Sequence, residues 1–347
     1  MQCRDERGQT HMKPDGRTGN NTGDPPGAQP EKTEKDLKKE KRRRVLSRFA
    51  KILTGFVVVS VTATETMMFI LFGRSDRQSD APFGLTDWAA SRGYSMRVIE
   101  FESCGNTLKG YIASPAHPRA MMLVVHGVRS SSDAMDGVVR CFLEKDYAVM
   151  CFDGTASGRS GGSGTVGLQQ QRYDVRAALE VLKGVPSLAR LPLILFGHSA
   201  GAYGVAAESG TPNVRAVVCV SGFDSPLKTM RYWAEHYAGA LSNVEYPFLW
   251  LREFIKKGSE ATASAAQALR ESGVPALVVH GSGDDVIPME VSLYQAVQSA
   301  PLPNVQLIRV DGEGRRGHTD ILVSDRAGDN DALLSHIAAF LRPYITD

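Results

Sequence analysis

The stretch of sequence that decides the fold is Leu193-Ile194-Leu195-Phe196-Gly197-His198-Ser199-Ala200-Gly201. An apolar run suited to a buried strand leads directly into a turn, and a helical stretch follows. Side chains at Gly197 or Gly201 would collide in so tight a turn, and Ser199 takes a strained backbone conformation within it. The pattern therefore predicts a nucleophile elbow, with a serine hydroxyl pointed into a crevice. A glycine-rich turn that happens to hold a serine is the alternative, and it leaves the flanking strand and helix unexplained.

Around this stretch, short apolar runs alternate with helical segments, which predicts a mostly parallel α/β sheet. The expected buried strands are residues 121–125, 148–152, 193–196, 214–220, 276–279 and 305–310. The expected helices are residues 133–145, 171–182, 202–209, 289–298 and 331–341. Two more strands, 97–102 and 107–113, are expected to form an antiparallel hairpin at the edge of the sheet.

The N-terminal part of the chain has a different composition. Residues 1–44 are expected to form a disordered basic arm, because they contain few large apolar residues to offset the entropy of ordering. Residues 45–73 are expected to form a transmembrane signal anchor, within which Ile52 to Phe72 is about long enough to span a bilayer as a helix. The Lys/Arg cluster before it predicts a cytoplasmic N-terminus, with the remainder of the chain across the membrane. Residues 74–95 are expected to be a linker.

Some features of the apolar segment favour other interpretations. An ionised Glu65 at the bilayer centre would cost about 2.5 to 3.5 kcal/mol, unless protonation or a partner reduced that cost. Val61-Thr62-Ala63 resembles a signal-peptidase site, although the apolar run that follows favours an uncleaved anchor. A buried helix of a soluble domain is the remaining alternative, and the absence of an amphipathic pattern counts against it.

Charge and cysteine content exclude some classes of protein. The chain has 347 residues and a formal net charge of +2, and its densest basic run lies at residues 35–44, so we do not expect nucleic-acid binding by the whole chain. The five cysteines contain no CxxC pair, and we expect no metal site. Pairing between cysteines stays open.

From about Met96 to the C-terminus the chain resembles the α/β-hydrolase superfamily, closest to its serine aminopeptidase-like and acylglycerol lipase-like members. Val124-Val125-His126-Gly127 is similar to the HG oxyanion loop of that superfamily. Asp153-Gly154 and residues 158–162 resemble its next loop, with Thr155-Ala156-Ser157 in place of the usual residues. The resemblance implies a hydrolase domain over residues 96–347, in which helices flank a mostly parallel central sheet, with a small helical cap at about 223–260.

The chemistry of acyl transfer and the resemblance together assign roles to particular residues. Two backbone N–H donors are expected for the oxyanion, from Val128 and Ala200. The segment 278–288 resembles the acid loop of the superfamily and selects Asp284, with Asp285 as runner-up and a turn-forming role as the alternative for Asp284. The segment 314–322 matches its histidine loop and makes His318 the general base. His236, in the expected cap, is the competing histidine.

The expected cap is rich in aromatic residues, which are suited either to line an acyl pocket or a membrane-facing lid or to form the core of a small helical insertion. They are Phe223, Tyr232, Trp233, Tyr237, Tyr246, Phe248, Trp250 and Phe254. The expected function is that of a serine esterase or lipase with a Ser199-Asp284-His318 catalytic triad, no metal and no cofactor, acting on small acyl substrates at a membrane. A short-peptide serine aminopeptidase and a catalytically silent, membrane-tethered binding protein are the alternatives.

Overall fold

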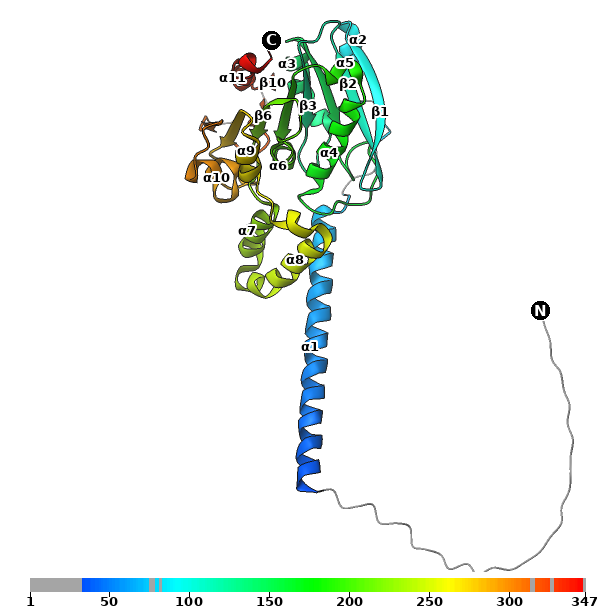
Figure 1. The fold of residues 1–347 in the computed structure, drawn as a ribbon, viewed down its shortest axis with the longest axis vertical. Helices are drawn as coiled ribbons and strands as arrows, with labels where there is room; N and C mark the ends of the chain where they lie inside the picture. The colour runs from blue at the N-terminus through cyan, green and yellow to red at the C-terminus, as the bar shows by residue number, and fades with distance from the viewer. Residues whose placement is uncertain (1–32, 75–78, 81–82, 313–315, 325–327, 346–347) are drawn as a thin grey trace, which may run out of the picture. The chain divides into compact units, whose positions relative to one another are not determined.

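The computed structural model describes residues 33–74, 79–80, 83–312, 316–324 and 328–345 of the chain (Figure 1). It divides into two compact units, residues 1–57 and residues 58–347. The second unit contains the central sheet, the helices that cover it and the last turns of the long first helix.

The central sheet has eight strands in the order β1-β2-β4-β3-β5-β6-β7-β8. The strands are β1 (Ser95–Ser103), β2 (Asn106–Ser114), β3 (Ala120–Val125), β4 (Tyr147–Phe152), β5 (Leu193–His198), β6 (Val214–Val220), β7 (Ala276–Gly281) and β8 (Val305–Val310). β1 and β2 form an antiparallel hairpin, β2 pairs antiparallel with β4, and the other neighbours are parallel. The predicted mostly parallel sheet with an edge hairpin is confirmed. A separate two-stranded sheet pairs β9 (Val323–Ser324) with β10 (Gly328–Asp329).

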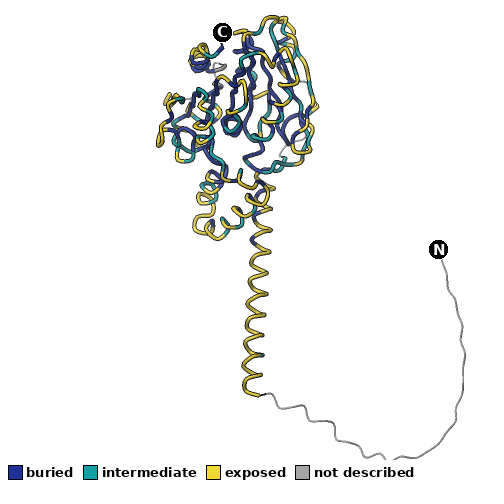
Figure 2. The backbone as a smooth tube through the Cα atoms, viewed as in Figure 1, coloured by how far each residue is buried: buried dark blue, intermediate teal, exposed yellow. Residues whose placement is uncertain are grey.

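Helices cover both faces of the sheet, so strands β3, β4, β5 and β7 are buried along their whole length (Figure 2). One face packs against α4 (Gln170–Lys183), α6 (Ala200–Ala207), α9 (Ala265–Ser272) and α10 (Leu293–Ser299). The other packs against α3 (Asp136–Leu143) and α11 (Asp331–Leu341). The shorter elements are α2 (Thr86–Ser91), α5 (Pro186–Ala189), η1 (Ser132–Met135), η4 (Met289–Val291) and η5 (Arg342–Tyr344). Helices α2, α5 and α9 were not predicted.

A helical cap follows strand β6. It consists of α7 (Pro226–Ala238), η2 (Gly239–Leu241), α8 (Ser242–Lys257) and η3 (Gly258–Thr262). Its aromatic residues do not behave as one group. Phe223 is buried and stacks on Tyr203 at a ring distance of 5.0 Å, whereas Trp250 and Phe254 stack on each other at 5.3 Å and are exposed.

Helix α1 (Glu34–Phe72) begins earlier than predicted. Residues 34–44, expected to be disordered, are helical, and ion pairs one turn apart support this part: Lys38 Nζ with Glu34 Oε1 and Arg44 Nη2 with Glu40 Oε1, each at 2.6 Å. The rest of the expected arm, residues 1–32, lies outside the described residues. By length and composition α1 could cross a membrane.

In the second unit, the last turns of α1 contact the cap through one face. The buried residues of α1 recur every fourth position: Ser60, Thr64, Met68 and Phe72. The Ser60 and Thr64 hydroxyls donate to the Glu245 carboxylate on α8, at 3.1 and 3.5 Å. The Glu65 carboxylate, whose cost in a membrane was noted above, accepts from Arg252 at 3.0 Å and from Lys256 at 3.3 Å.

Backbone hydrogen bonds join the end of α1 directly to the loop that precedes α4. The Thr165 N–H donates to the Phe72 carbonyl and the Arg74 N–H donates to the Ser163 carbonyl, both at 2.8 Å. The Arg74 guanidinium also donates to the Gly158 carbonyl at 2.6 Å. The expected linker, residues 74–95, therefore begins tied to the domain and contains helix α2.

Candidate active site

Ser199 lies in a sharp turn between β5 and α6, with φ 57° and ψ −122°. This left-handed backbone is rare for a residue with a side chain and is found where the surrounding structure imposes it. A Cβ on Gly197 would lie 2.4 Å from the Gly201 carbonyl, and a Cβ on Gly201 would lie 2.4 Å from the Val125 carbonyl oxygen. Both positions therefore require glycine, as the sequence predicted.

His318 and Asp284 meet, although 34 residues separate them in sequence. The His318 Nδ1 lies 2.8 Å from Asp284 Oδ2 and 3.0 Å from Oδ1. Asp284 also accepts from the backbone N–H of Ile287 at 2.7 Å, so it forms the turn and holds the histidine at once. Burial alone would raise the Asp284 pKa, but the hydrogen bond and charge of His318 outweigh burial and lower it.

Asp285 and His236, the alternatives for the acid and the base, have different surroundings. Asp285, the runner-up for the acid, is exposed, whereas Asp284 is buried. His236 lies on α7, where its ring contacts those of Tyr232, Trp233 and Tyr237.

His198 connects the elbow to the histidine loop. Its Nε2–H donates to the His318 carbonyl at 2.8 Å, and the two ring centroids are 4.9 Å apart. Burial, together with the charge of His318, lowers the pKa of His198 to about 4. Among the described residues Ser199 makes no side-chain hydrogen bond, so its hydroxyl is not yet paired with His318. Such contacts often form only when substrate binds.

The backbone of the loop after β3 lies against the elbow. A Cβ on Gly127 would lie 2.8 Å from the Ser199 Cβ, so the chain passes the nucleophile closely just before Val128. The His126 Nδ1–H donates to the Gly127 carbonyl at 2.6 Å, and His126 Nε2 accepts from the Gly154 N–H at 2.9 Å. Burial lowers the pKa of His126, which favours this neutral ring. Ala200 is the first residue of α6, where an N–H has no intrahelical partner.

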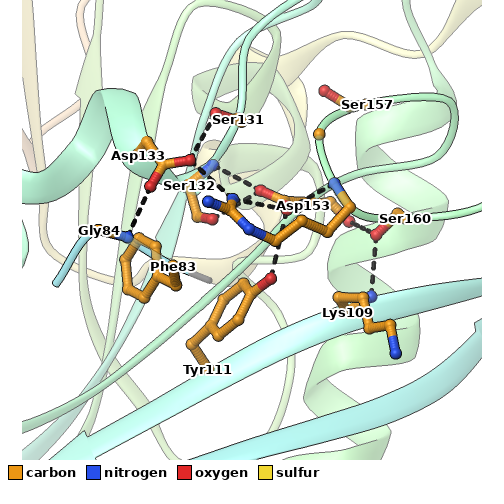
Figure 3. A network of polar contacts seen from close by, with 12 residues as sticks. Phe83, Gly84, Lys109, Tyr111, Ser131, Ser132, Asp133, Asp153, Ser157 and Ser160 are labelled. Atoms are coloured by element: carbon orange, nitrogen blue, oxygen red, sulfur yellow. Dashed lines mark hydrogen bonds and ion pairs between the residues drawn. The ribbon is translucent and has the colours of Figure 1, made fainter. Parts of the chain in front are cut away.

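A buried carboxylate network fixes the loops after β3 and β4 (Figure 3). Asp153 is fully buried and accepts from the backbone N–H and hydroxyl of Ser132, at 2.8 and 2.6 Å. It also accepts from the Arg159 N–H at 2.9 Å, and the Arg159 guanidinium bridges to Asp133 at 2.6 Å. The sequence singled out Asp153 and Arg159 but not these partners. The sequence signal that could have identified these partners is the cluster of polar residues that follows each of the strands β3 and β4.

A second buried carboxylate, Asp174 on α4, holds the unusual Thr155-Ala156-Ser157 segment. It accepts from the Thr155 N–H at 2.8 Å, from the Thr155 hydroxyl at 2.9 Å and from the Ser103 hydroxyl at 2.6 Å. Asp174 was not identified from the sequence, because its partners other than Gln170 of the same helix lie on distant segments.

The described residues contain no cluster of three or more His, Cys, Asp or Glu side chains that could hold a metal ion. Four cysteines lie within the described residues, and all four are free thiols: Cys104, Cys141, Cys151 and Cys219. Gly314 and Arg315, at the start of the predicted histidine loop, lie outside the described residues.

Comparison with known proteins adds both sequence and structural relatives. A family profile described as "Serine aminopeptidase, S33" matches residues 116–247. The proteins named "Uncharacterized protein YfhR" from Escherichia coli O157:H7 and strain K12 are 27% identical over 277 residues, covering 76% of this chain and 86% of theirs. The esterase Pf2001 of Pyrococcus furiosus is 19% identical with a TM-score of 0.59, over 79% of this chain and 99% of that one. Est1E from Butyrivibrio proteoclasticus, solved with ferulic acid, is 16% identical with a TM-score of 0.53, over 72% and 100%.

Proposed function

We propose that the chain is a serine hydrolase of the α/β-hydrolase superfamily that cleaves carboxylic esters through an acyl-Ser199 intermediate, because it shares its fold with a solved esterase and matches a hydrolase family profile over residues 116–247. The observations that support this most directly are a strained, glycine-flanked Ser199 and a His318 that Asp284 holds by its Nδ1, with His198, the neighbour of Ser199, donating to the His318 carbonyl. Serine, aspartate and histidine also follow one another along the chain in the order typical of this fold.

In the proposed reaction, Ser199 Oγ attacks the ester carbonyl carbon while its proton passes to His318 Nε2. Asp284 keeps the imidazole oriented and stabilises its protonated form. The N–H groups of Val128 and Ala200 bind the negative charge that develops on the carbonyl oxygen. His318 then protonates the departing alkoxide. In the second half, His318 takes a proton from a water as that water attacks the acyl-serine carbonyl. His318 then returns the proton to Ser199 Oγ as the acyl C–O bond breaks, which releases the acid and restores the serine hydroxyl.

Short-peptide or aminoacyl-amide hydrolysis is the second candidate. The family profile described as "Serine aminopeptidase, S33" favours it. The same acyl-enzyme steps apply, with an amine in place of an alcohol as the leaving group. A panel of acyl esters, monoacylglycerols, thioesters and aminoacyl amides separates the two, because Ser199-dependent turnover of amides alone would overturn the ester proposal.

The test of a serine mechanism is covalent labelling of the full chain by a fluorophosphonate probe. Ser199→Ala should abolish labelling and ester hydrolysis. Ser221→Ala is a matched control, because Ser221 also has a positive φ, at 52°, directly after neighbouring strand β6, and its buried hydroxyl has no partner among the described residues. If the intact protein failed to react with the probe, and Ser199→Ala equalled wild type on every substrate, a silent binding protein would replace this proposal.

We also propose that α1 anchors the chain in a membrane with its N-terminus cytoplasmic and the hydrolase domain on the other side. The supporting observations are the apolar segment and the Lys/Arg cluster before it. Labelling with a membrane-impermeant maleimide in sealed vesicles of known orientation tests this topology, because Cys3 and the exposed Cys104 should react from opposite sides. Reaction of both from one side would refute it.

A further inference from the structure

Helix α8 of the cap has an apolar exposed face and a charged buried face. Its solvent-facing side is apolar, and we call the following residues the outer stripe: Val244, Trp250, Leu251, Phe254 and Ile255, which are 44%, 41%, 48%, 48% and 72% exposed. Their spacing of three, four and seven places them on one face of the helix. The opposite side carries charge, since Glu253 is fully buried and Lys257 is 8% exposed.

The inward charges are satisfied within the protein. Arg252 pairs with Glu253 at 2.6 Å and with Glu65 of α1 at 3.0 Å. The Lys257 ammonium donates to Glu253 and to the Gln169 side chain. These charged side chains of α8 therefore have protein partners and do not depend on bulk water. A helix next to an apolar phase needs such partners, because an unpaired charge is costly outside water.

The outer stripe lies beside exposed apolar residues of α1. Val58, Val59 and Val61 of α1 are 58%, 66% and 46% exposed. Between the two helices lies a cavity of about 150 Å³. Val61, Phe248, Leu251 and Ile255 line its apolar part, and Thr64 with the paired charges Glu65, Arg252 and Lys256 line the rest. Helix α8 lies beside the last turns of α1 in Figure 1, and many residues of both are coloured as exposed in Figure 2.

The dimensions of α1 connect this surface to a membrane. The cap contacts α1 from Ser60 onward, and the twelve-residue rise from Ser60 to Phe72 is about 18 Å at 1.5 Å per residue. That is more than half of the roughly 30 Å that the segment 52–72 offers to a bilayer. Insertion of this segment into a bilayer would therefore place α8 in the lipid as well. An α8 with unpaired charges on its outer face would be excluded from that position by the cost of transferring those charges into lipid.

We propose that the outer stripe of α8 lies among lipid acyl chains, beside α1, so that the cap is part of the membrane-bound surface of the protein. A lipid bilayer is favoured as the occupant because the stripe lies beside a helix that could itself cross a membrane, and because Glu253 and Lys257 are turned inward while the exposed Lys256 pairs with Glu65 of α1. The proposal rests on the anchoring role of α1 and is independent of the hydrolase chemistry.

Tryptophan fluorescence in vesicles tests the position of α8 directly. The full chain carrying Trp88→Phe and Trp233→Phe keeps Trp250 alone, and the matched control carrying Trp233→Phe and Trp250→Phe keeps Trp88 alone. Both are reconstituted in phosphatidylcholine vesicles whose acyl chains carry bromine. We expect a blue-shifted Trp250 emission that loses intensity to the brominated chains and resists aqueous iodide, and no bromine quenching of Trp88.

Two results would overturn the proposal. Quenching of Trp250 by iodide but not by brominated lipid would place the stripe in water. Protection from both quenchers, with concentration-dependent self-association, would assign the stripe to a second copy of the chain.

A double variant adds a functional test. Phe254→Ser with Ile255→Ser should retain wild-type turnover of a water-soluble ester and lose turnover of the same ester embedded in vesicles. Val98→Ser is the control, because Val98 is 62% exposed but lies on β1, away from the cap. Equal loss on both substrates would contradict the proposal, whereas inactivity of wild type on every ester would count against the hydrolase function alone and leave the fluorescence result standing.

Discussion

The stability of the hydrolase domain should fall steeply in mild acid because of His198. This ring is buried behind the nucleophile and donates to the His318 carbonyl at 2.8 Å. Burial and the neighbouring charge of His318 lower its pKa from 6.5 to about 4 in the folded chain. Below pH 6.5 the unfolded chain binds a proton at this position, and the folded chain does not bind it until about pH 4.

The size of this effect follows from the difference between the two pKa values. The pKa difference is between two and three units, and each unit is worth roughly 1.4 kcal/mol, so His198 alone removes about 3 kcal/mol as the pH falls from 6.5 to below about 4. That is a large share of the roughly 5 to 15 kcal/mol by which a domain is stable. His126 and His280, whose pKa values burial also lowers, act in the same direction.

Urea unfolding of detergent-solubilised protein across this pH range measures the effect. His198→Gln keeps a side-chain donor and removes the titration, so the free energy of unfolding should fall less with acid than in wild type. His336→Gln is the control, since His336 is exposed on α11. Identical pH dependence in wild type and His198→Gln would refute the reasoning.

Three further substitutions give defined outcomes. Gly201→Ala should abolish probe labelling and impair folding, because the added Cβ would lie 2.4 Å from a backbone carbonyl oxygen. Gly210→Ala is the control: its Cβ would lie 4.0 Å from the nearest atom, so labelling and melting temperature should match wild type. Asp284→Asn should lower kcat for ester hydrolysis by about four orders of magnitude, and Asp285→Asn should change it little. Asp153→Asn should cost about 3 to 5 kcal/mol in urea unfolding, because it leaves buried donors without their carboxylate; a loss below about 1 kcal/mol would contradict the importance of the network.

The features that were predicted correctly from the sequence depend on residues close together in the chain. The strand before Gly197 and the tight turn at Ser199 depend on contiguous residues, and the Asp284–His318 pair depends on short loops at the ends of adjacent strands. Helix α9 was missed although its signal is local, since Ser264 caps it by accepting from the Gln267 N–H at 3.1 Å.

Other features depend on partners that sequence order does not reveal. Asp174 is satisfied in part by Ser103, 71 residues away, so nothing near it predicted a buried role. The apolar and charged faces of α8 are visible in the sequence, but which of them points inward depends on Glu65 and Gln169, on separate segments of the chain. The early start of α1 was missed because composition alone suggested disorder, while Glu34 and Glu40 supply regularly spaced ion pairs.

Backbone hydrogen bonds between Phe72 and Thr165, and between Arg74 and Ser163, attach the end of α1 directly to the sheet domain. If α1 anchors the chain as proposed, this joint would hold the sheet domain beside the anchor instead of on a flexible tether. Under the proposed anchoring, encounters with a lipid-embedded substrate would follow two-dimensional diffusion.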